Sequence, residues 1–328
     1  MDGLVSQRPT RDWRGCRVFV TGATGFVGSH LARRLLGAGA DVTVLVRPAS
    51  HRFRIADIAR ELHVVEGDCS DIGSVARILD AAKPQIVFHA AAAGVVPSTP
   101  SESVLHTNVF GTFAIANGCA NAGVERLIHF GSSFEYGEGS ALSEESSLCP
   151  TTIYGASKAA GTILAQSIGR STGLKVISIR LFTPYGPWER ATRLVPSAIV
   201  NGLLRRDMNM TSGEQERDLV YIDDAVEGVL LAAGSDTAVG NVLNLCSGQG
   251  TRMRSAVELI YRLLGQPASI HVGAIPYRTG EMFFQSGTNK LARMHLGWQP
   301  TVDLEEGLQR TIDWYREHRD LLDQLSEA

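Results

Sequence analysis

Three closely spaced glycines constrain the fold of this chain more than any other feature. They lie in the segment TGATGFVG, residues 21–28, which follows the apolar run Val18–Val20 and precedes leucines at helical spacing. Glycine lets a backbone approach a phosphate closely, and a helix N-terminus presents unpaired N–H groups and a partial positive charge. The sequence therefore predicts a strand, a tight turn and a helix that together hold the pyrophosphate of a dinucleotide.

The rest of the N-terminal half alternates short β-branched runs with segments of helical period. Such alternation is typical of a parallel sheet with helices on both faces. We therefore expect the α/β class and a doubly wound (Rossmann) fold. The expected strands are Val18–Val20, Val42–Val46, His63–Val65, Ile86–Phe88, Leu127–Phe130 and Val176–Arg180, and the expected helices cover residues 26–38, 73–82, 102–122 and 154–171.

The pattern changes after residue 182. The next stretch, up to Arg217, carries three prolines and little alternation, and a strand-and-helix unit follows at Asp218–Ala233. This order predicts a second part of the chain that is interleaved with the first. We expect an N-terminal leader at 1–15, a dinucleotide-binding domain at 16–182 plus 218–248, and a smaller C-terminal substrate lobe at 183–217 plus 249–328.

Charge and cysteine content limit the partners and the compartment. The formal net charge is −3 at pH 7, which gives no reason to expect nucleic acid or an anionic membrane surface as a partner. The longest apolar stretch, residues 86–96, is too short to span a bilayer. The five cysteines are scattered without Cys-x-x-Cys spacing, which indicates reduced thiols and no metal site. We expect a cytoplasmic protein.

A second motif, YGASK at residues 154–158, places the phenol of Tyr154 and the ammonium of Lys158 four residues apart. On a helix these side chains lie on one face, one turn from each other. A nearby cation favours the phenolate, so we expect Lys158 to lower the pKa of Tyr154 toward the range where it exchanges protons. Taken alone, the same spacing also describes an ordinary pair on a helix surface.

Together the two motifs resemble the extended branch of the short-chain dehydrogenase/reductase superfamily, which comprises nucleotide-sugar epimerases, dehydratases and reductases. The resemblance extends over residues 16–316 and includes further motifs in the same order. These are Gly67-Asp68, His89-Ala90-Ala91, Ser132-Ser133 before Tyr136-Gly137, RLFTPYGP at 180–187, RDLVYIDD at 217–224 and LGWQP at 296–300.

The resemblance implies a role for each matched residue. Tyr154 is the general acid/base on a sugar hydroxyl or keto oxygen, Lys158 holds the nicotinamide ribose, and Ser132 hydrogen-bonds the same sugar oxygen as Tyr154. The cofactor-binding residues are Gly22, Thr24, Gly25, Phe26, Val27, Gly28, Arg47, Asp68, Cys69, Ala90, Ala91, Tyr154 and Lys158. The residues implied for a nucleotide-diphosphate sugar substrate are Ser133, Thr183 and two arginines for the diphosphate, Arg217 and Arg278.

The end of the second expected strand indicates which dinucleotide binds. NAD-specific relatives carry an acidic residue there, which holds both ribose hydroxyls. Here that position is Val46, and Arg47, Arg52 and Arg54 follow. A neutral residue followed by arginine suits the 2′-phosphate of NADP, which a carboxylate would repel. We predict NADP, with NAD as the alternative.

The residue two positions beyond Ser132 bears on the reaction. Sugar 4,6-dehydratases of this family carry a glutamate there, and this chain has Phe134, which cannot act as a base. Glu135 is adjacent, but along a strand a shift of one residue turns its side chain to the other face. We therefore do not expect dehydratase activity.

Reduction and epimerisation remain. NADP favours net reduction, so the leading hypothesis is an NADPH-dependent reductase of a nucleotide-linked 4-keto-6-deoxy sugar, with Tyr154 as proton donor. The alternatives are a nucleotide-sugar 4-epimerase that keeps NAD tightly bound, and a cofactor-binding sensor without turnover. Helices near 102–122 and 154–171 match those that form a four-helix bundle between subunits in many relatives, which implies a homodimer.

Overall fold

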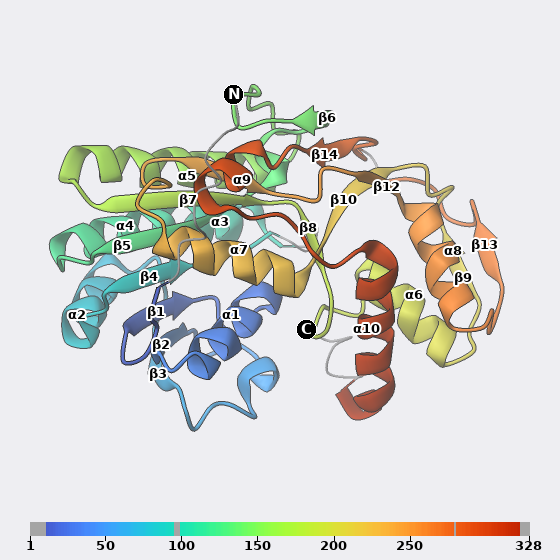
Figure 1. Cartoon of the computed structure of the whole chain (residues 1–328), viewed down its shortest axis with the longest axis horizontal. Coiled ribbons are helices and arrows are strands. Elements are labelled where there is room, and N and C mark those ends of the chain that lie inside the picture. The colour runs from blue at the N-terminus through green and yellow to red at the C-terminus, as the bar shows by residue number, and fades with distance from the viewer. Residues whose placement is uncertain (1–10, 95–98, 279, 322–328) are drawn as a thin grey trace.

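The computed structural model describes residues 11–94, 99–278 and 280–321. Its centre is a seven-stranded parallel sheet with the strand order β11-β7-β5-β4-β1-β2-β3 (Figure 1). The strand order runs outward in opposite directions from the adjacent strands β1 and β4. Open α/β sheets bind their ligands at the carboxyl ends of the strands, at such a switch point. The strands are β1 (Arg17–Thr21), β2 (Asp41–Val46), β3 (His63–Glu66), β4 (Ile86–His89), β5 (Arg126–Ser132), β7 (Lys175–Leu181) and β11 (Val242–Leu245).

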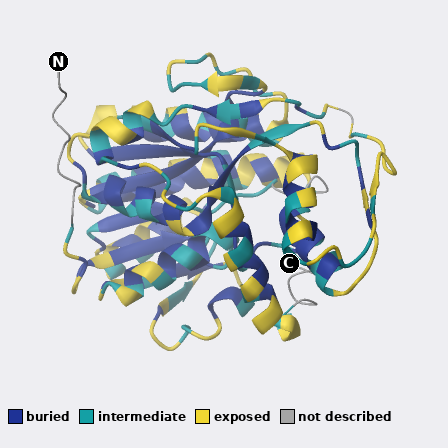
Figure 2. Ribbon diagram, turned by 45° about the vertical axis from the view of Figure 1, so that its right-hand side comes forward, coloured by how far each residue is buried: buried dark blue, intermediate teal, exposed yellow. Residues whose placement is uncertain are grey.

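Helices cover both faces of this sheet, which confirms the doubly wound class. Along β1 the side chains of Val18 and Val20 join one buried apolar cluster, and Phe19 joins the other. Figure 2 shows the strands as buried segments between more exposed helices. The first cluster includes α1 (Phe26–Gly37) and α7 (Ile222–Gly234), and the second includes α2 (Ile72–Ala82), α4 (Gly111–Asn121) and α5 (Ile153–Thr172).

The helix expected at 102–122 consists of three segments. A short helix, α3 (Ser101–Leu105), leads into a π-helix at His106–Phe110, and α4 follows. The wider turn buries Asn108, whose amide exchanges two hydrogen bonds with the backbone of Ala93, at 2.8 and 2.9 Å. π-turns inside α-helices often mark functional sites. The other expected strands and helices are present, with bounds shifted by at most two residues.

Smaller sheets and further helices lie beyond the carboxyl end of β7, on the right in Figure 1. The strand β8 begins only two residues after β7 and pairs with β10 in a sheet of its own. The strands here are β6 (Gly139–Leu142), β8 (Thr183–Tyr185), β9 (Met208–Met210), β10 (Glu216–Tyr221), β12 (Gly250–Arg252), β13 (Ile270–Val272) and β14 (Gln285–Gly287). The helices are α6 (Leu194–Leu203), α8 (Met253–Leu263) and α10 (Leu304–Glu317), while α9 (Lys290–Leu296) packs near α7 and β11.

One buried carboxylate fastens β10 to two distant segments. Asp218 accepts hydrogen bonds from the backbone N–H and hydroxyl of Ser247, at 2.6 and 2.7 Å, and from the N–H groups of Gly248 and Gly287. Buried charge requires such donors. The expected dinucleotide-binding domain included residues 218–248. In the structure, β10 lies in the small sheet, whereas α7 and β11 lie with the large one.

Within the described ranges, no helix is both long and apolar enough to cross a bilayer.

Candidate active site

The glycine turn between β1 and α1 has no room for side chains at two of its three glycines. Gly22 has a φ of +76°, and a Cβ there would lie 2.6 Å from the backbone nitrogen of Ala91. A Cβ on Gly28 would lie 2.1 Å from the carbonyl oxygen of Gly22. The turn is closed by a hydrogen bond of 2.9 Å from Gly25 N–H to the same oxygen. The backbone of strand β1 therefore meets helix α1 at a distance that only glycine permits.

The N-terminus of α1 is open to an anion. Gly25 is the N-cap residue, and no described side chain accepts from the first N–H groups of the helix. The first turn also lacks acidic residues. Thr24, Phe26 and Val27 are all partly exposed, so the unpaired N–H groups beside them are reachable. These residues fit the pyrophosphate of a dinucleotide, because a helix N-terminus with free N–H groups binds phosphate.

The end of the neighbouring strand β2 presents one free arginine. Arg47 is exposed. Burial acts to raise the pKa of the nearby Asp68, but hydrogen bonds from Ser70, with a smaller effect from the charge of Arg47, hold that pKa below its usual value. Arg52 instead pairs with Glu66, and Arg54 is buried with Nε 2.8 Å from the carbonyl oxygen of Trp188. Of the three arginines expected near the adenosine ribose, only Arg47 is available there.

The carboxyl end of β4 lies against the glycine turn. Ala90 and Ala91 are partly exposed, and Ala91 N–H donates to Thr21 Oγ1 at 3.2 Å. Cys69 is different, since its side chain is buried and Sγ lies 2.9 Å from where a Cβ on Gly111 would be. Burial raises the pKa of Cys69 to about 11, so the thiol stays neutral. The side chain of Cys69 is therefore a buried packing contact with Gly111 at the start of α4.

Tyr154 and Lys158 lie one turn apart on α5, as the spacing predicts. The helix begins at Ile153 because Thr152 caps it, with a bond of 3.0 Å from Gly155 N–H to Thr152 Oγ1. A Cβ on Gly155 would lie 2.4 Å from the carbonyl oxygen of Phe134, so this glycine lets the helix approach the end of β5. The close approach brings Tyr154 against the turn that Ser132 caps, where its ring packs edge-on against Phe134 with 5.7 Å between ring centroids.

The expected effect of Lys158 on the pKa of Tyr154 is wrong. Burial raises the pKa of Tyr154 above its usual value, and the neighbouring Ser132 hydroxyl and the charge of Arg193 oppose the rise. Lys158 instead donates to the carbonyl oxygen of Phe130. Burial lowers the pKa of Lys158 to about 8, against an attractive effect from Glu135. The ammonium group of Lys158 is therefore held against strand β5 by the carbonyl oxygen of Phe130.

The local structure at Glu135 differs from the strand that the sequence analysis assumed. Ser133–Glu135 is a turn of 3-10 helix that Ser132 caps, not a continuation of strand β5. Glu135 is fully buried, and its oxygens accept from Ser132 N–H at 2.8 Å, Thr162 Oγ1 at 2.9 Å and Arg180 Nε at 2.8 Å. With these donors in place, Glu135 has no free oxygen with which to remove a substrate proton. Glu135 therefore has a structural role, in which it joins Ser132, Thr162 and Arg180.

Asn108 is a buried residue next to the site that the sequence analysis did not single out. Its side-chain nitrogen donates to Ser157 Oγ at 2.9 Å, one turn away from Tyr154 on the same helix, while the amide also holds Ala93. The available signal was an asparagine inside a helical run whose other buried positions, apart from Thr112, are apolar or glycine. Asparagine is unfavourable inside a helix, so its presence there indicates a specific hydrogen-bonding task.

The four expected substrate residues lie in two groups. Ser133 is buried beside Ser132, and Thr183 is partly exposed in β8. Arg217, in β10, donates from Nη2 to Glu281 Oε1 at 2.6 Å, and Glu281 N–H bonds to the carbonyl oxygen of the exposed Arg278. Arg217 is therefore paired with Glu281, and Arg278 is exposed three residues before Glu281 along the chain.

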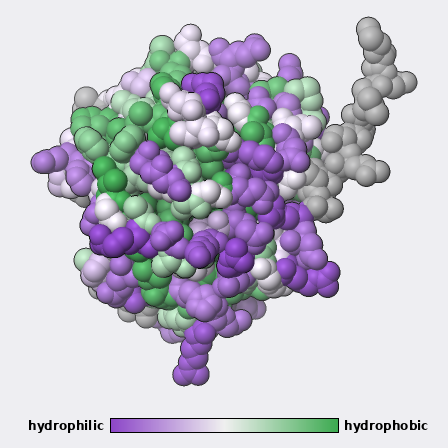
Figure 3. Space-filling model, turned by 90° about the vertical axis from the view of Figure 1, so that its left-hand side faces the viewer, coloured by the Kyte–Doolittle hydropathy of each residue, from purple (hydrophilic) through white to green (hydrophobic). Residues whose placement is uncertain are grey.

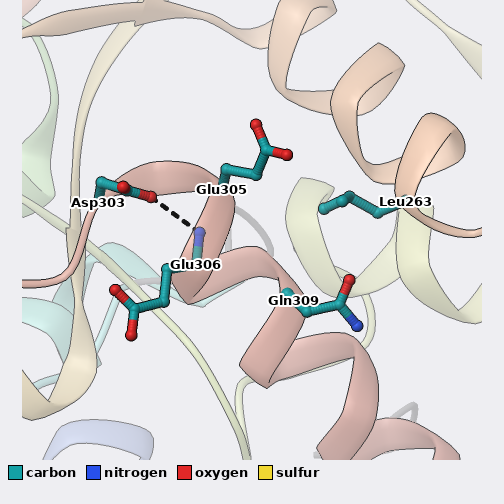
Figure 4. Close-up of a pocket in the computed structure, with 5 residues that line it drawn as sticks. All are labelled: Leu263, Asp303, Glu305, Glu306 and Gln309. Carbon is teal, nitrogen blue, oxygen red and sulfur yellow. Dashed lines mark hydrogen bonds between the residues drawn. The ribbon is translucent and has the colours of Figure 1, made fainter.

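A separate pocket lies between α8 and the N-terminus of α10 (Figure 4). Its lining includes the carboxylates of Glu305 and Glu306, together with Asp303, which caps α10 by accepting from Glu306 N–H at 2.9 Å. Negative charge on this lining would repel a nucleotide diphosphate. The substrate site is therefore expected beside Arg217 and Tyr154, away from this pocket.

Comparison with known proteins agrees with this geometry. Residues 18–246 match the model of the NAD dependent epimerase/dehydratase family. A curated relative, UDP-glucuronate 4-epimerase 3 of Arabidopsis thaliana, is 31% identical over 93% of this chain and 77% of its own length.

Two solved structures share the whole fold. The UDP-glucose 4-epimerase of Thermotoga maritima, with UDP-glucose, superposes with a TM-score of 0.85 at 27% identity, covering 92% of this chain and 98% of that one. The dTDP-glucose 4,6-dehydratase of Streptomyces venezuelae, with NAD bound, has a TM-score of 0.85 at 30% identity, covering 94% and 99%. This chain therefore belongs to the NAD-dependent epimerase/dehydratase family, the NAD(P)-dependent enzymes that modify nucleotide sugars.

Proposed function

We propose that this protein is a nucleotide-sugar 4-epimerase that keeps NAD tightly bound. The observation that carries the proposal is that Tyr154, on the helix that also carries Lys158, packs against Phe134 in the turn that Ser132 caps. Several similar relatives are 4-epimerases, which supports epimerisation over the NADPH-dependent reduction that the sequence favoured.

In this mechanism Tyr154 accepts the proton of the C4 hydroxyl and later returns it to the C4 oxygen from the other side of the turned sugar. When bound, NAD would supply the hydride acceptor for C4 and give the hydride back. Ser132 steadies the C4 oxygen by hydrogen bonding. Because burial holds the pKa of Tyr154 above its usual value, the phenolate needs support, and Arg193 and Ser132 oppose the rise.

Dehydration is not proposed, although some relatives are 4,6-dehydratases. That reaction needs a base near C5 of the sugar, and Phe134 occupies the position where the dehydratases carry it. The Phe134 ring packs edge-on against Tyr154, with 5.7 Å between ring centroids. Glu135 cannot replace the base, because Ser132, Thr162 and Arg180 already use its oxygens.

An NADPH-dependent reductase of a 4-keto-6-deoxy sugar is the second candidate, and Arg47 favours it. Arg47 is exposed at the end of β2, where no carboxylate occupies position 46 and where a 2′-phosphate of NADP would meet a cation. The preference for NADP rests on this arginine alone, since Arg52 and Arg54 have other partners. A single surface cation is weaker support than a set of several.

The fate of the cofactor separates the two candidates. We expect the purified protein to release NAD only on denaturation, and to interconvert a nucleotide sugar with its C4 epimer without consuming added NADPH. An epimerase regenerates its cofactor in each cycle, so it does not need to exchange the cofactor between turnovers. A protein isolated without cofactor, which binds NADPH more tightly than NADH and oxidises it in step with a keto sugar, would contradict the epimerase and support the reductase.

We also propose a homodimer built on α4 and α5. Five large apolar side chains there or just before α4 are 37–56% exposed, namely Leu105, Phe110, Phe113, Ile153 and Ile163. Figure 3 views the left-hand side of Figure 1, where α2, α4 and α5 lie, and shows hydrophobic side chains grouped among hydrophilic ones. Exposed apolar groups of this kind mark contact surfaces. Light scattering that gives the mass of one chain at micromolar concentration would exclude the dimer.

A further inference from the structure

The turn that follows β8 holds a tryptophan in a strained backbone conformation. Trp188 has a φ of +67°, in the left-handed region that bulky residues rarely adopt. Such a conformation persists only where the surrounding structure fixes it. The carbonyl oxygens of residues 187–189, which we call the Trp188 turn, accept hydrogen bonds from side chains of three separate elements. The bonds are His30 Nε2 to Pro187, Arg54 Nε to Trp188 and Tyr315 Oη to Glu189, each 2.8 Å.

The ring of Trp188 is enclosed by the same elements. The centroid of the Trp314 ring, in α10, lies 4.9 Å from that of Trp188, and the centroid of the Phe53 ring lies 6.3 Å from it. The guanidinium carbon of Arg33, in α1, lies 5.0 Å from the Trp188 ring centroid. The Trp188 turn is therefore fixed through both its backbone and its side chain, by α1, by the segment after β2 and by α10.

Arg54, in the segment after β2, also bonds a second turn. Its Nη1 donates to the carbonyl oxygen of Thr24 at 3.4 Å, and Thr24 lies in the glycine turn between β1 and α1. The side chain of Arg54 is buried, and Arg33 Nη2 donates to the Arg54 carbonyl oxygen at 2.5 Å, which holds the backbone as well. One buried guanidinium therefore bonds both the glycine turn, which is proposed for the pyrophosphate, and the Trp188 turn.

The guanidinium of Arg54 keeps its charge in this buried position. Burial, with a smaller effect from the charge of Arg190, lowers the pKa of Arg54 to about 10, which leaves the group protonated at neutral pH. Among the described residues, its hydrogen-bond acceptors are the two backbone carbonyl oxygens and no carboxylate. A charged donor strengthens each of these bonds, and its removal leaves both carbonyl oxygens without this partner.

The Trp188 turn lies close along the chain to residues expected at the substrate. It begins two residues after β8, whose first residue is Thr183. Strand β8 pairs with β10, with Leu219 opposite Thr183, and β10 also carries Arg217. A shift of the Trp188 turn would therefore be transmitted to β8 over a short length of backbone.

We propose that Arg54 is a positioning residue that makes binding of the dinucleotide and binding of the nucleotide diphosphate cooperative. A ligand that orders one of the two turns fixes the guanidinium, so the second ligand loses less conformational entropy when it orders the other turn. The inference rests on the proposed function for the places of the two ligands, at the glycine turn and near Arg217. The competing roles for Arg54 are support of the fold alone and direct attraction of the pyrophosphate.

The test measures the dissociation constant of UDP, or of dTDP if it binds more tightly, by calorimetry on protein saturated with NAD and on protein freed of it. We expect the wild type to bind the diphosphate at least about fivefold more tightly when NAD is present. In Arg54→Met this ratio should fall to about twofold or less. Arg52→Met removes a more exposed arginine, paired with Glu66, two residues earlier. This variant is the matched control and should keep the wild-type ratio.

A wild-type ratio near one, or no binding of either diphosphate, would overturn the proposal. An unchanged ratio in Arg54→Met would overturn it as well, and would assign Arg54 to the fold if only the melting temperature falls, or to the pyrophosphate if NAD binds more weakly. Arg54→Lys keeps the charge but replaces the paired donors with one ammonium, so it should lower the ratio even if Arg54→Met does not fold.

The proposed function is tested separately by turnover. A wild type that epimerises a nucleotide sugar without showing the ratio would refute only the role of Arg54. A wild type that shows the ratio but epimerises no nucleotide sugar would refute only the proposed function.

Discussion

The Tyr154→Phe enzyme is expected to turn over its nucleotide sugar about 10²–10⁴-fold more slowly than the wild type, with its fold and cofactor content unchanged. The change removes one oxygen, which is the atom proposed to exchange the C4 proton. A loss of this size corresponds to about 3–5 kcal/mol of transition-state stabilisation. Phenylalanine fills the same space beside Phe134, so packing of the site is retained. Initial rates and the NAD released on denaturation measure the two effects.

Tyr261→Phe is the matched control for this experiment. Its phenol lies on α8 and donates to the carbonyl oxygen of Arg206 at 3.3 Å, with no contact to the candidate active site. We expect this variant to retain full turnover. Unchanged turnover in Tyr154→Phe would remove Tyr154 as the proton carrier. A wild type that binds the cofactor but transforms no nucleotide sugar would support the sensor.

The second large effect is expected from Gly28→Ala, which should abolish retention of the cofactor and lower the melting temperature. A Cβ on residue 28 would lie 2.1 Å from the carbonyl oxygen and 2.7 Å from the carbonyl carbon of Gly22. Both are backbone atoms, so no side chain can rotate to relieve the overlap. Helix α1 must move away from the turn, which displaces the N–H groups proposed for the pyrophosphate. Overpacking of this kind costs about 1–3 kcal/mol or more.

Gly37→Ala provides the control on the same helix. A Cβ at the last residue of α1 meets no atom within 4 Å, and the backbone there is helical. Alanine is a better helix former than glycine, so this variant should keep the cofactor and be as stable as the wild type or slightly more stable. Thermal unfolding and cofactor content are the measurements. Normal cofactor content in Gly28→Ala would show that the turn does not hold the dinucleotide.

Most of the fold could be predicted from the sequence because its signals are local. Val18 and Val20 face one side of the sheet and Phe19 the other, and this alternation with flanking helical periods suffices to indicate a doubly wound sheet. The glycine spacing likewise reports a local requirement, since Gly22 and Gly28 touch backbone within the same turn or the neighbouring strand. The break at the π-helix was not predictable, because Asn108 is held there by Ala93 and Ser157, which are distant in sequence.

The roles of the charged residues depended on tertiary structure. Arg47 and Arg54 look alike along the chain, yet Arg54 turns inward to the carbonyl of Trp188 while Arg47 stays exposed. The structural role of Glu135 could not be predicted from the sequence, because a capped 3-10 turn replaces the expected strand and three donors surround the carboxylate.

By itself, the sequence determined the fold class, the dinucleotide turn and the Tyr154–Lys158 pair, because spacing along one strand, turn or helix is enough to define each of them. Only the tertiary structure decided that burial raises the pKa of Tyr154 and that Lys158 donates to the carbonyl oxygen of Phe130. The physical reason is that burial and charge act through space. A residue's pKa and partners are therefore set by neighbours that the chain brings together only when it folds.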